Sequence, residues 1–421
     1  MFLRDLQWLD EDGAWQRGDV RVHAGRIVEL GPALDHRGDE VLAGDGMKLV
    51  PGAIDPHTHL RAPGKSRAEG VARGSRAALA GGVTTLLDMP NNRPPTSTAG
   101  RLEQKRQIFR RQCRTHWGLH GHASASGSFL DPRGIPAIKI YMAKSSELPA
   151  LVDVDALSRV FMHYPVVAVH AEDERCFGSG PRHGARRPRS AVVRALDSLE
   201  RALLRLPEDR RPRLVLCHAT TVEEISWLRR LKVQGFDVWG ETCPHYLAFT
   251  EDDVERSSAR LQVNPPIRLA EDRAALRAAL VDGTLDFIAT DHAPHLPGEK
   301  LGPNPPSGIA SIEWLLPFAT QLVEQGLIGW RRLTELCTRN AAACYRIPGR
   351  GAIAPGQVAD LVVLAPRDRV EPRHTVVTGA GWTPYCFEQF DHAVYATLVA
   401  GRVAYLDGTW PPGVLGEELY T

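Results

Sequence analysis

The sequence has almost no excess of charge and no cysteine framework. Its 421 residues include 51 lysines and arginines against 50 aspartates and glutamates, which gives a formal net charge of +1. No global positive field therefore favours nucleic acid or an anionic membrane as a partner. The seven cysteines are scattered and include no C-x-x-C pair, a pattern that favours buried free thiols in a reducing compartment over disulfides. We predict a cytoplasmic protein with no nucleic-acid or membrane partner.

Long apolar runs are also missing. Residues 1–6 contain an arginine, an aspartate and no apolar core, so we expect no signal peptide. No window approaches the roughly 18 consecutive apolar residues of a membrane span. No G-x-G-x-x-G follows the first predicted strand of the main domain, which argues against a dinucleotide-binding sheet. A hydrophobic content of 43% is ordinary for a globular chain, and the length suffices for more than one domain.

Both ends of the chain consist of short alternating patterns separated by glycine- or proline-bearing turns. Alternation of apolar and polar residues is typical of strands with one buried face. We predict that residues 1–50 and 346–421 together form one small β-sandwich domain. The alternating segments are residues 18–22, 26–30, 359–364, 393–399 and 402–405.

The middle of the chain, residues 51–345, alternates apolar strand-like runs with helical patterns. Near-continuous apolar strands between helices are typical of a parallel sheet that is covered on both faces. Eight such units over about 300 residues favour a (β/α)8 TIM-like barrel, with a doubly wound open sheet as the alternative. The eight runs end near residues 54, 87, 119, 142, 170, 218, 241 and 291.

The segment Asp55-Pro56-His57-Thr58-His59-Leu60-Arg61 directly follows the first of these runs. Alternate side chains of a strand share a face, so His57, His59 and Arg61 are expected to point the same way. Two neighbouring imidazoles suit a divalent metal ion, and the guanidinium beside them suits a carboxylate. Two surface histidines beside a surface arginine are the alternative, because short motif matches are often accidental.

Ionisable residues also end other predicted strands. The fourth strand contains Lys139, the fifth ends at His170, the sixth at His218 and the eighth at Asp291. Each alone has an ordinary structural explanation, such as a helix cap or a snorkelling lysine. Because the carboxyl ends of barrel strands meet at one rim, their joint placement predicts a site for two metal ions. Imidazole-rich ligation favours Zn²⁺, with Mn²⁺ or Co²⁺ as substitutes.

Lys139 is an unusual neighbour for metal ligands. An ammonium group makes little electrostatic sense beside cations, whereas an amine that burial has deprotonated can react with CO₂. N6-carboxylated Lys139 would offer two anionic oxygens as a bridge between the metals. Cys217 precedes His218 and, as its neighbour in a strand, is expected to face away from the site.

Longer motifs carry a family resemblance. Residues 289–300, A-T-D-H-A-P-H-L-P-G-E-K, resemble the long dihydroorotase motif around the last metal ligand, and residues 57–61 resemble its H-x-H-x-R. Residues 88–95 resemble its M-P-N-x-x-P-P stretch, and residues 263–268 resemble its V-N-P-P-L-R segment. Residues 351–362 resemble the return into the small β domain. The chain thus resembles the amidohydrolase superfamily, and within it the dihydroorotases, along essentially its whole length.

The resemblance implies a role for each candidate residue. The metal ligands would be His57, His59, Lys139, His170, His218 and Asp291, with Lys139 carboxylated and two Zn²⁺ per chain. Asp291 would also be the catalytic base and then the acid. The substrate-binding residues would be Arg61, Asn91 and His295 at the carboxylate, and Asn264 and the backbone near Gly308 at the ring amide groups.

The implied reaction is the reversible cyclisation of N-carbamoyl-L-aspartate to L-dihydroorotate in pyrimidine synthesis. A hydantoinase or allantoinase is the first alternative, although such enzymes generally lack an arginine at the position of Arg61. A non-catalytic dihydroorotase-like subunit that supports a transcarbamoylase is the second, and the six filled ligand positions argue against it. We also predict a homodimer, which could have a transcarbamoylase as a further partner.

Some segments differ from the family pattern, and one basic segment is not part of that pattern. Ala62 stands where Glu or Gln is usual, and Cys243-Pro244-His245-Tyr246 replaces the more common P-H-H, which leaves the subfamily open. The basic stretch at residues 182–189 is expected to be a solvated loop, with a docking loop as the alternative.

Overall fold

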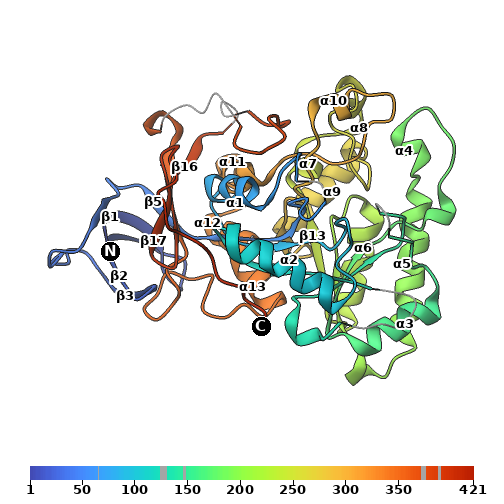
Figure 1. The fold of residues 1–421 in the computed structure, drawn as a ribbon, viewed down its shortest axis with the longest axis horizontal. Coiled ribbons are helices and arrows are strands. Elements are labelled where there is room, and N and C mark those ends of the chain that lie inside the picture. The colour runs from blue at the N-terminus through green and yellow to red at the C-terminus, as the bar shows by residue number, and fades with distance from the viewer. Residues whose placement is uncertain (65, 124–129, 146–147, 371–375, 387–389) are drawn as a thin grey trace.

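The computed structural model describes residues 1–64, 66–123, 130–145, 148–370, 376–386 and 390–421. Figure 1 shows a sheet that contains the blue N-terminal and the red C-terminal strands on one side, and a body of alternating strands and helices on the other. Within the described residues, no helix is both long and apolar enough to span a bilayer.

The sheet at one end of the molecule is built from both termini. Its strands are β1 (Phe2–Leu9), β2 (Trp15–His23), β3 (Arg26–Gly31), β4 (Val41–Ala43), β5 (Lys48–Pro51), β15 (Leu361–Pro366), β16 (His392–Val399) and β17 (Arg402–Leu406). The strand order is β17-β16-β15-β5-β1-β2-β3, with β4 paired to β1. The antiparallel pair β5–β15 joins the two ends of the chain and sets Val50 opposite Val362. The predicted sandwich is thus one connected sheet, and its exact boundaries in the chain stay a prediction.

The barrel strands are short, buried and parallel. They are β6 (Ala53–Thr58), β7 (Val83–Asp88), β8 (His116–Leu119), β9 (Gly121–His122), β10 (Ile138–Tyr141), β11 (Val166–His170), β12 (Arg213–Leu216), β13 (Val238–Thr242) and β14 (Phe287–Ile288). They form two arcs, β6-β7-β8 and β9 to β14, which His120 separates in the chain. On the other side the His59 N–H donates to the carbonyl of His292 at 2.8 Å, which closes the ring. The predicted (β/α)8 barrel with a β-rich terminal unit is confirmed.

Helices follow most barrel strands and cover the outside of the barrel (Figure 1). Their order and spacing match the alternating pattern of the middle segment. They are α1 (Val71–Ala80), α2 (Ala99–Gln112), α3 (Val154–His163), α4 (His183–Arg186), α5 (Arg189–Leu204), α6 (Val222–Val233), α7 (Pro244–Ala248), α8 (Glu251–Arg256), α9 (Ala270–Val281), α10 (Pro297–Lys300), α11 (Leu315–Glu324), α12 (Trp330–Thr334) and α13 (Asn340–Cys344).

The start of α6 shows how local sequence defines a strand end at the rim. The Glu224 N–H donates to the Thr221 hydroxyl, and the Glu224 carboxylate accepts from the N–H groups of Thr220 and Thr221. This capping box satisfies backbone donors that a helix start leaves unpaired. It also fixes the short connection between His218 and the helix.

A buried carboxylate joins the barrel to the terminal sheet. Asp360, one residue before β15, accepts hydrogen bonds from His116 Nε2 at 3.1 Å and from Arg350 Nε at 2.7 Å. It also accepts from the N–H of Ala400, which follows β16, at 2.8 Å. Burial would raise the pKa of Asp360, but its partners His116 and Arg350 outweigh it and lower that pKa.

We expect Asp360→Ala to lower the free energy of unfolding by about 3 kcal/mol, because three buried donors lose their acceptor. Chemical denaturation would measure the change. Asp209→Ala, at an exposed aspartate, is the control and should change stability by less than about 0.5 kcal/mol. Equal effects of the two substitutions would contradict this account of the junction.

Candidate active site

The six predicted metal ligands lie at the carboxyl ends of five barrel strands. His57 lies near the end of β6 and His59 follows it, Lys139 lies in β10, and His170 ends β11. His218 and Asp291 lie two and three residues beyond the ends of β12 and β14. All six are at most 8% exposed. Five of them line one cavity of about 550 Å³, whereas Lys139 does not line it.

The first group of ligands surrounds the Asp291 carboxylate. His59 Nε2 lies 3.0 Å and His57 Nε2 lies 3.3 Å from Asp291 Oδ1. One ligand atom from each of these three residues can be chosen so that the three atoms lie within 4.8 Å of one another. One metal ion could contact all three side chains, so the group is a candidate metal site.

The second group is a pair of facing imidazoles. His170 Nδ1 lies 3.1 Å from His218 Nε2. The His218 ring also lies beside that of His57, with 5.2 Å between the ring centroids, so the two groups adjoin. Within the described residues, the buried Lys139 Nζ and His218 Nδ1 have no hydrogen-bond partner.

Two buried carboxylates fix the orientation of the ligand rings. Glu241, in β13, accepts a hydrogen bond from His57 Nδ1 at 2.7 Å. Glu172 accepts from His170 Nε2 at 3.0 Å. A carboxylate at one ring nitrogen holds the proton there and leaves the lone pair of the other nitrogen for a metal ion. In both rings that other nitrogen faces a further predicted ligand.

The hydrogen bond of His59 tests whether a metal ion fits the site. His59 Nδ1 lies 2.7 Å from Asn91 Oδ1, which can only accept. In a neutral imidazole the Nε2 lone pair then faces the Asp291 carboxylate, an arrangement that is repulsive unless a cation lies between them. The donor set therefore fits a divalent cation.

The protonation states agree with this fit. Burial lowers the pKa values of His57 and His218 well below the usual range, so both rings are neutral near pH 7. Burial would raise the pKa of Asp291, but His57 and His59 outweigh it and lower that pKa. Neutral imidazoles and an ionised carboxylate are the forms that bind metal ions.

Asp55 connects the strands that carry the first group. Asp55 Oδ1 accepts from the backbone N–H of His57 at 3.2 Å and from that of Thr290 at 3.1 Å. The Thr290 hydroxyl donates to Asp55 Oδ2 at 2.5 Å. These bonds link the first strand of the barrel to the segment after the last one. Burial raises the pKa of Asp55 to about 7.

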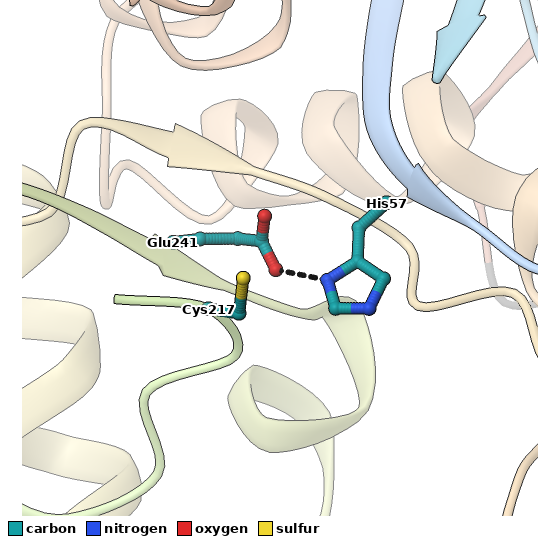
Figure 2. A group of neighbouring side chains, drawn as sticks. All are labelled: His57, Cys217 and Glu241. Carbon is teal, nitrogen blue, oxygen red and sulfur yellow. Dashed lines mark hydrogen bonds and ion pairs between the residues drawn. The ribbon is translucent and has the colours of Figure 1, made fainter. Parts of the chain in front are cut away.

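Cys217 contradicts the sequence-based expectation. Figure 2 shows its thiol beside Glu241 and His57, on the side of the ligands rather than away from them. The reason is the backbone of His218, which has a φ of 40° and ends the strict alternation of the strand. Burial raises the pKa of Cys217 to about 12, so the group is a neutral thiol.

The predicted substrate-binding residues are divided between two places. Arg61, Asn91, Asn264 and Gly308 all line the cavity that contains the metal ligands. His295 lines a neighbouring hollow instead, where its Nε2 lies 3.0 Å from Arg61 Nη2. The structure therefore brings four of the five together, and His295 contacts the arginine from the other side.

Three residues of this site have a strained backbone. Arg61, His218 and Asp291 have φ values of 61°, 40° and 43°, in the left-handed region that non-glycine residues rarely adopt. Gly308 has a φ of +133°, and a Cβ there would lie 2.4 Å from the carbonyl oxygen of Ala293. Strained residues of this kind cluster at functional sites, where the surrounding structure holds them.

Sequence reasoning missed several residues around the ligands. Glu241 and Glu172 carry no motif signal of their own, although Glu241 lies in a correctly predicted strand and Glu172 follows another. Arg187 belongs to the basic stretch that was expected to be solvated, but its side chain is 12% exposed, lines the cavity and pairs with Glu172. The solvated-loop prediction is wrong for Arg187, whereas Arg182 and Arg186 are exposed as expected.

Solved structures share this fold over the whole chain. An L-hydantoinase from Arthrobacter aurescens superposes with a TM-score of 0.89 and 24% identity, covering 100% of this chain and 99% of that one. A dihydropyrimidinase from Brevibacillus agri superposes with a TM-score of 0.86 and 23% identity, covering 100% and 99%. At these identities the likeness establishes the fold alone.

Curated relatives are closer in sequence. A dihydroorotase from Leifsonia xyli subsp. xyli is 32% identical over 93% of this chain and 94% of its own length. A dihydroorotase from Endomicrobium trichonymphae is 30% identical over 92% and 95%. The amidohydrolase family matches residues 49–127 and 211–404. The chain therefore belongs to the amidohydrolase family.

Proposed function

We propose that the chain is a dihydroorotase, which cyclises N-carbamoyl-L-aspartate to L-dihydroorotate and water, reversibly, in cytoplasmic pyrimidine synthesis. The observation that carries the proposal is Arg61, which lines the same cavity as five of the proposed metal ligands. A guanidinium suits the substrate carboxylate, which the rings of hydantoinase substrates lack. The sequence relatives named dihydroorotase support the same conclusion.

The proposal includes two divalent metal ions, Zn²⁺ in the first instance, with Mn²⁺ or Co²⁺ as substitutes. His57, His59 and Asp291 would hold one ion, and His170 and His218 the other. Lys139, carboxylated by CO₂, would bridge them, which would also give its buried nitrogen a role. Bound ions would polarise the ring amide carbonyl and make water a better nucleophile.

Asp291 is the proposed proton carrier. Its lowered pKa keeps it ionised, so in the hydrolytic direction it can accept the proton of the attacking water. The same carboxyl group would then donate that proton to the departing ring nitrogen. In the biosynthetic direction these two transfers run in reverse.

Arg61 and Asn91 would orient the substrate. The Asn91 carbonyl oxygen contacts His59, and its amide nitrogen donates to the Ser145 hydroxyl at 3.2 Å. The second hydrogen of that nitrogen would donate to the carboxylate. Asn264 and the backbone at Gly308, which line the same cavity, would bind the ring amide groups. Holding the ring in one pose near the reacting groups is a large part of the catalytic effect in such reactions.

Assembly is a further part of the proposal. The resemblance to dihydroorotases suggests a homodimer, and a transcarbamoylase as an additional partner. Light scattering on the purified chain would measure the oligomer.

We expect Arg61→Ala to lower kcat/KM for dihydroorotate hydrolysis by about 100-fold or more, because a buried carboxylate contact is lost. The absorbance of the dihydroorotate ring would follow the reaction. Arg37→Ala, at an exposed arginine of the terminal sheet region, is the matched control and should leave turnover unchanged. Undiminished turnover by Arg61→Ala would point instead to a hydantoinase-like substrate without the carboxylate.

We also expect two metal ions per chain and a carboxylated Lys139. Chelation should abolish activity, and Zn²⁺, Mn²⁺ or Co²⁺ should restore it. Elemental analysis would count the ions, and carbon-13 NMR after exposure to labelled bicarbonate would detect the carbamate. Lys139→Met is the control, and it should lack the carbamate signal. An unmodified amine at Lys139 in the metal-loaded protein would contradict the bridge.

A further inference from the structure

A second, wider hollow adjoins the active-site cavity. Arg61 lines both, so the two spaces meet at the proposed carboxylate contact. We call the second hollow the basic vestibule. Its charged or titratable lining residues within the described chain are Arg61, Arg67, Arg93, His295 and Glu299.

The charge of this region differs from that of the whole chain. The two connected spaces are lined by five lysines and arginines and by two acidic residues, whereas the complete sequence is almost balanced at 51 to 50. The five cations are Arg61, Arg67, Arg93, Lys144 and Arg187, and the acids are Asp291 and Glu299. Charge of one sign gathered in a concave surface focuses the electric potential there.

We propose that the basic vestibule is an entry site for anions that concentrates the dianionic substrate N-carbamoyl-L-aspartate at the mouth of the cavity. The proposal rests on the proposed function, since it takes its ligand from that reaction. Arg67 and Arg93 are exposed, so their effect is screened by salt and does not require a fixed contact.

The substrate and the product of the biosynthetic reaction differ in charge, so the proposal predicts a different effect on each compound. N-carbamoyl-L-aspartate has two carboxylates, and dihydroorotate has one. A positive potential raises the local concentration of an anion over its concentration in bulk solution by a certain factor. Because the electrostatic energy is proportional to charge, the factor for a dianion is the square of the factor for a monoanion. The vestibule should therefore favour the biosynthetic substrate over the product.

The test is the double variant Arg67→Gln/Arg93→Gln in the metal-loaded protein. We expect the KM for N-carbamoyl-L-aspartate to rise about fivefold at an ionic strength of about 10 mM, and that for dihydroorotate only about twofold. The two kcat/KM values must fall by the same factor, because their ratio is the equilibrium constant of the reaction. Both rises in KM should shrink at about 150 mM. Arg4→Gln/Arg37→Gln, at two exposed arginines outside the cavities, is the control and should change neither value.

The outcomes separate the two proposals. Equal rises in the two KM values, or rises that do not depend on salt, would overturn the vestibule and leave the proposed function standing. If the wild-type chain with its metals turns over neither compound, the proposed function and the vestibule fall together. Metal content and thermal unfolding temperature equal to wild type exclude structural damage in the variant.

A different observation concerns Lys300, the last residue of the segment 289–300. Its ammonium group is buried, with 1% of the residue exposed, and forms no ion pair within the described chain. Nζ donates instead to the carbonyl oxygens of Gln262 at 2.9 Å, Pro306 at 3.0 Å and Gly308 at 3.1 Å. Burial lowers the pKa of Lys300 to about 7.

These three carbonyls belong to two segments that both reach the cavity. Gln262 precedes Asn264 by two residues, and Gly308 and Asn264 are the proposed contacts to the ring amides. The Gly308 N–H also donates to the Gln262 carbonyl at 2.9 Å. We infer that Lys300 is a positioning residue that sets the spacing between Asn264 and Gly308 around the substrate ring. This inference rests on the proposed function.

Lys300→Met keeps the length of the side chain and removes its donors. We expect KM for dihydroorotate to rise about tenfold with kcat within about twofold, because binding contacts move while the proton carrier does not. Hydrogen exchange at residues 305–308 should become faster, and Lys300→Arg should recover part of the loss in KM.

An unchanged KM in Lys300→Met would overturn this role. Equal losses of kcat, metal content and thermal stability would also overturn it, because they would mark a purely structural lysine. If wild type is inactive on dihydroorotate, the fault lies with the proposed function, and the inference about Lys300 fails with it.

Discussion

The hydrogen bonds from Thr290 to Asp55 join the two edges of the barrel at the point where the proposed chemistry takes place. Asp55 lies two residues before His57, and Thr290 lies one residue before Asp291. The carboxylate thus sets the distance between two proposed ligands that are more than two hundred residues apart in the chain. Together with the bond from the His59 N–H to the His292 carbonyl, this closure holds the strained backbone at Asp291 against the first strand.

The proposed metal and substrate functions share one side chain. Asn91 accepts from His59 through its oxygen and donates to the Ser145 hydroxyl through its nitrogen, whose second hydrogen would serve the proposed carboxylate contact. A bound substrate that pulls on the amide also acts on the orientation of a proposed metal ligand. The buried acids Glu241 and Glu172 orient the imidazole rings of His57 and His170. Each acid contacts the ring nitrogen that faces away from the proposed metal ion, so it leaves the space for that ion free.

Much of the fold and of the site could be predicted from the sequence. The eight barrel strands, the union of both termini, and the ligands at strand ends follow from periodicity and from the rule that strand ends meet at one rim. Glu241 could not be predicted in this way, because its contact with His57 crosses between strands. Glu172 lies beyond the end of β11, where alternation no longer places a side chain, and Arg187 contacts it from a segment outside the strands. Cys217 was misjudged because alternation holds only within a strand, and the left-handed His218 lies beyond the end of β12.

The pairing of β5 with β15 has a consequence for how the protein is made. Strands β1 to β5 leave the ribosome first, but the partner that covers the edge of β5 is synthesised about three hundred residues later. Until then that edge offers unpaired backbone groups to other chains. Closing so long a loop is also slow compared with forming local contacts. The nascent chain therefore passes through a period in which its first strands need protection from aggregation, and the last strands end that period.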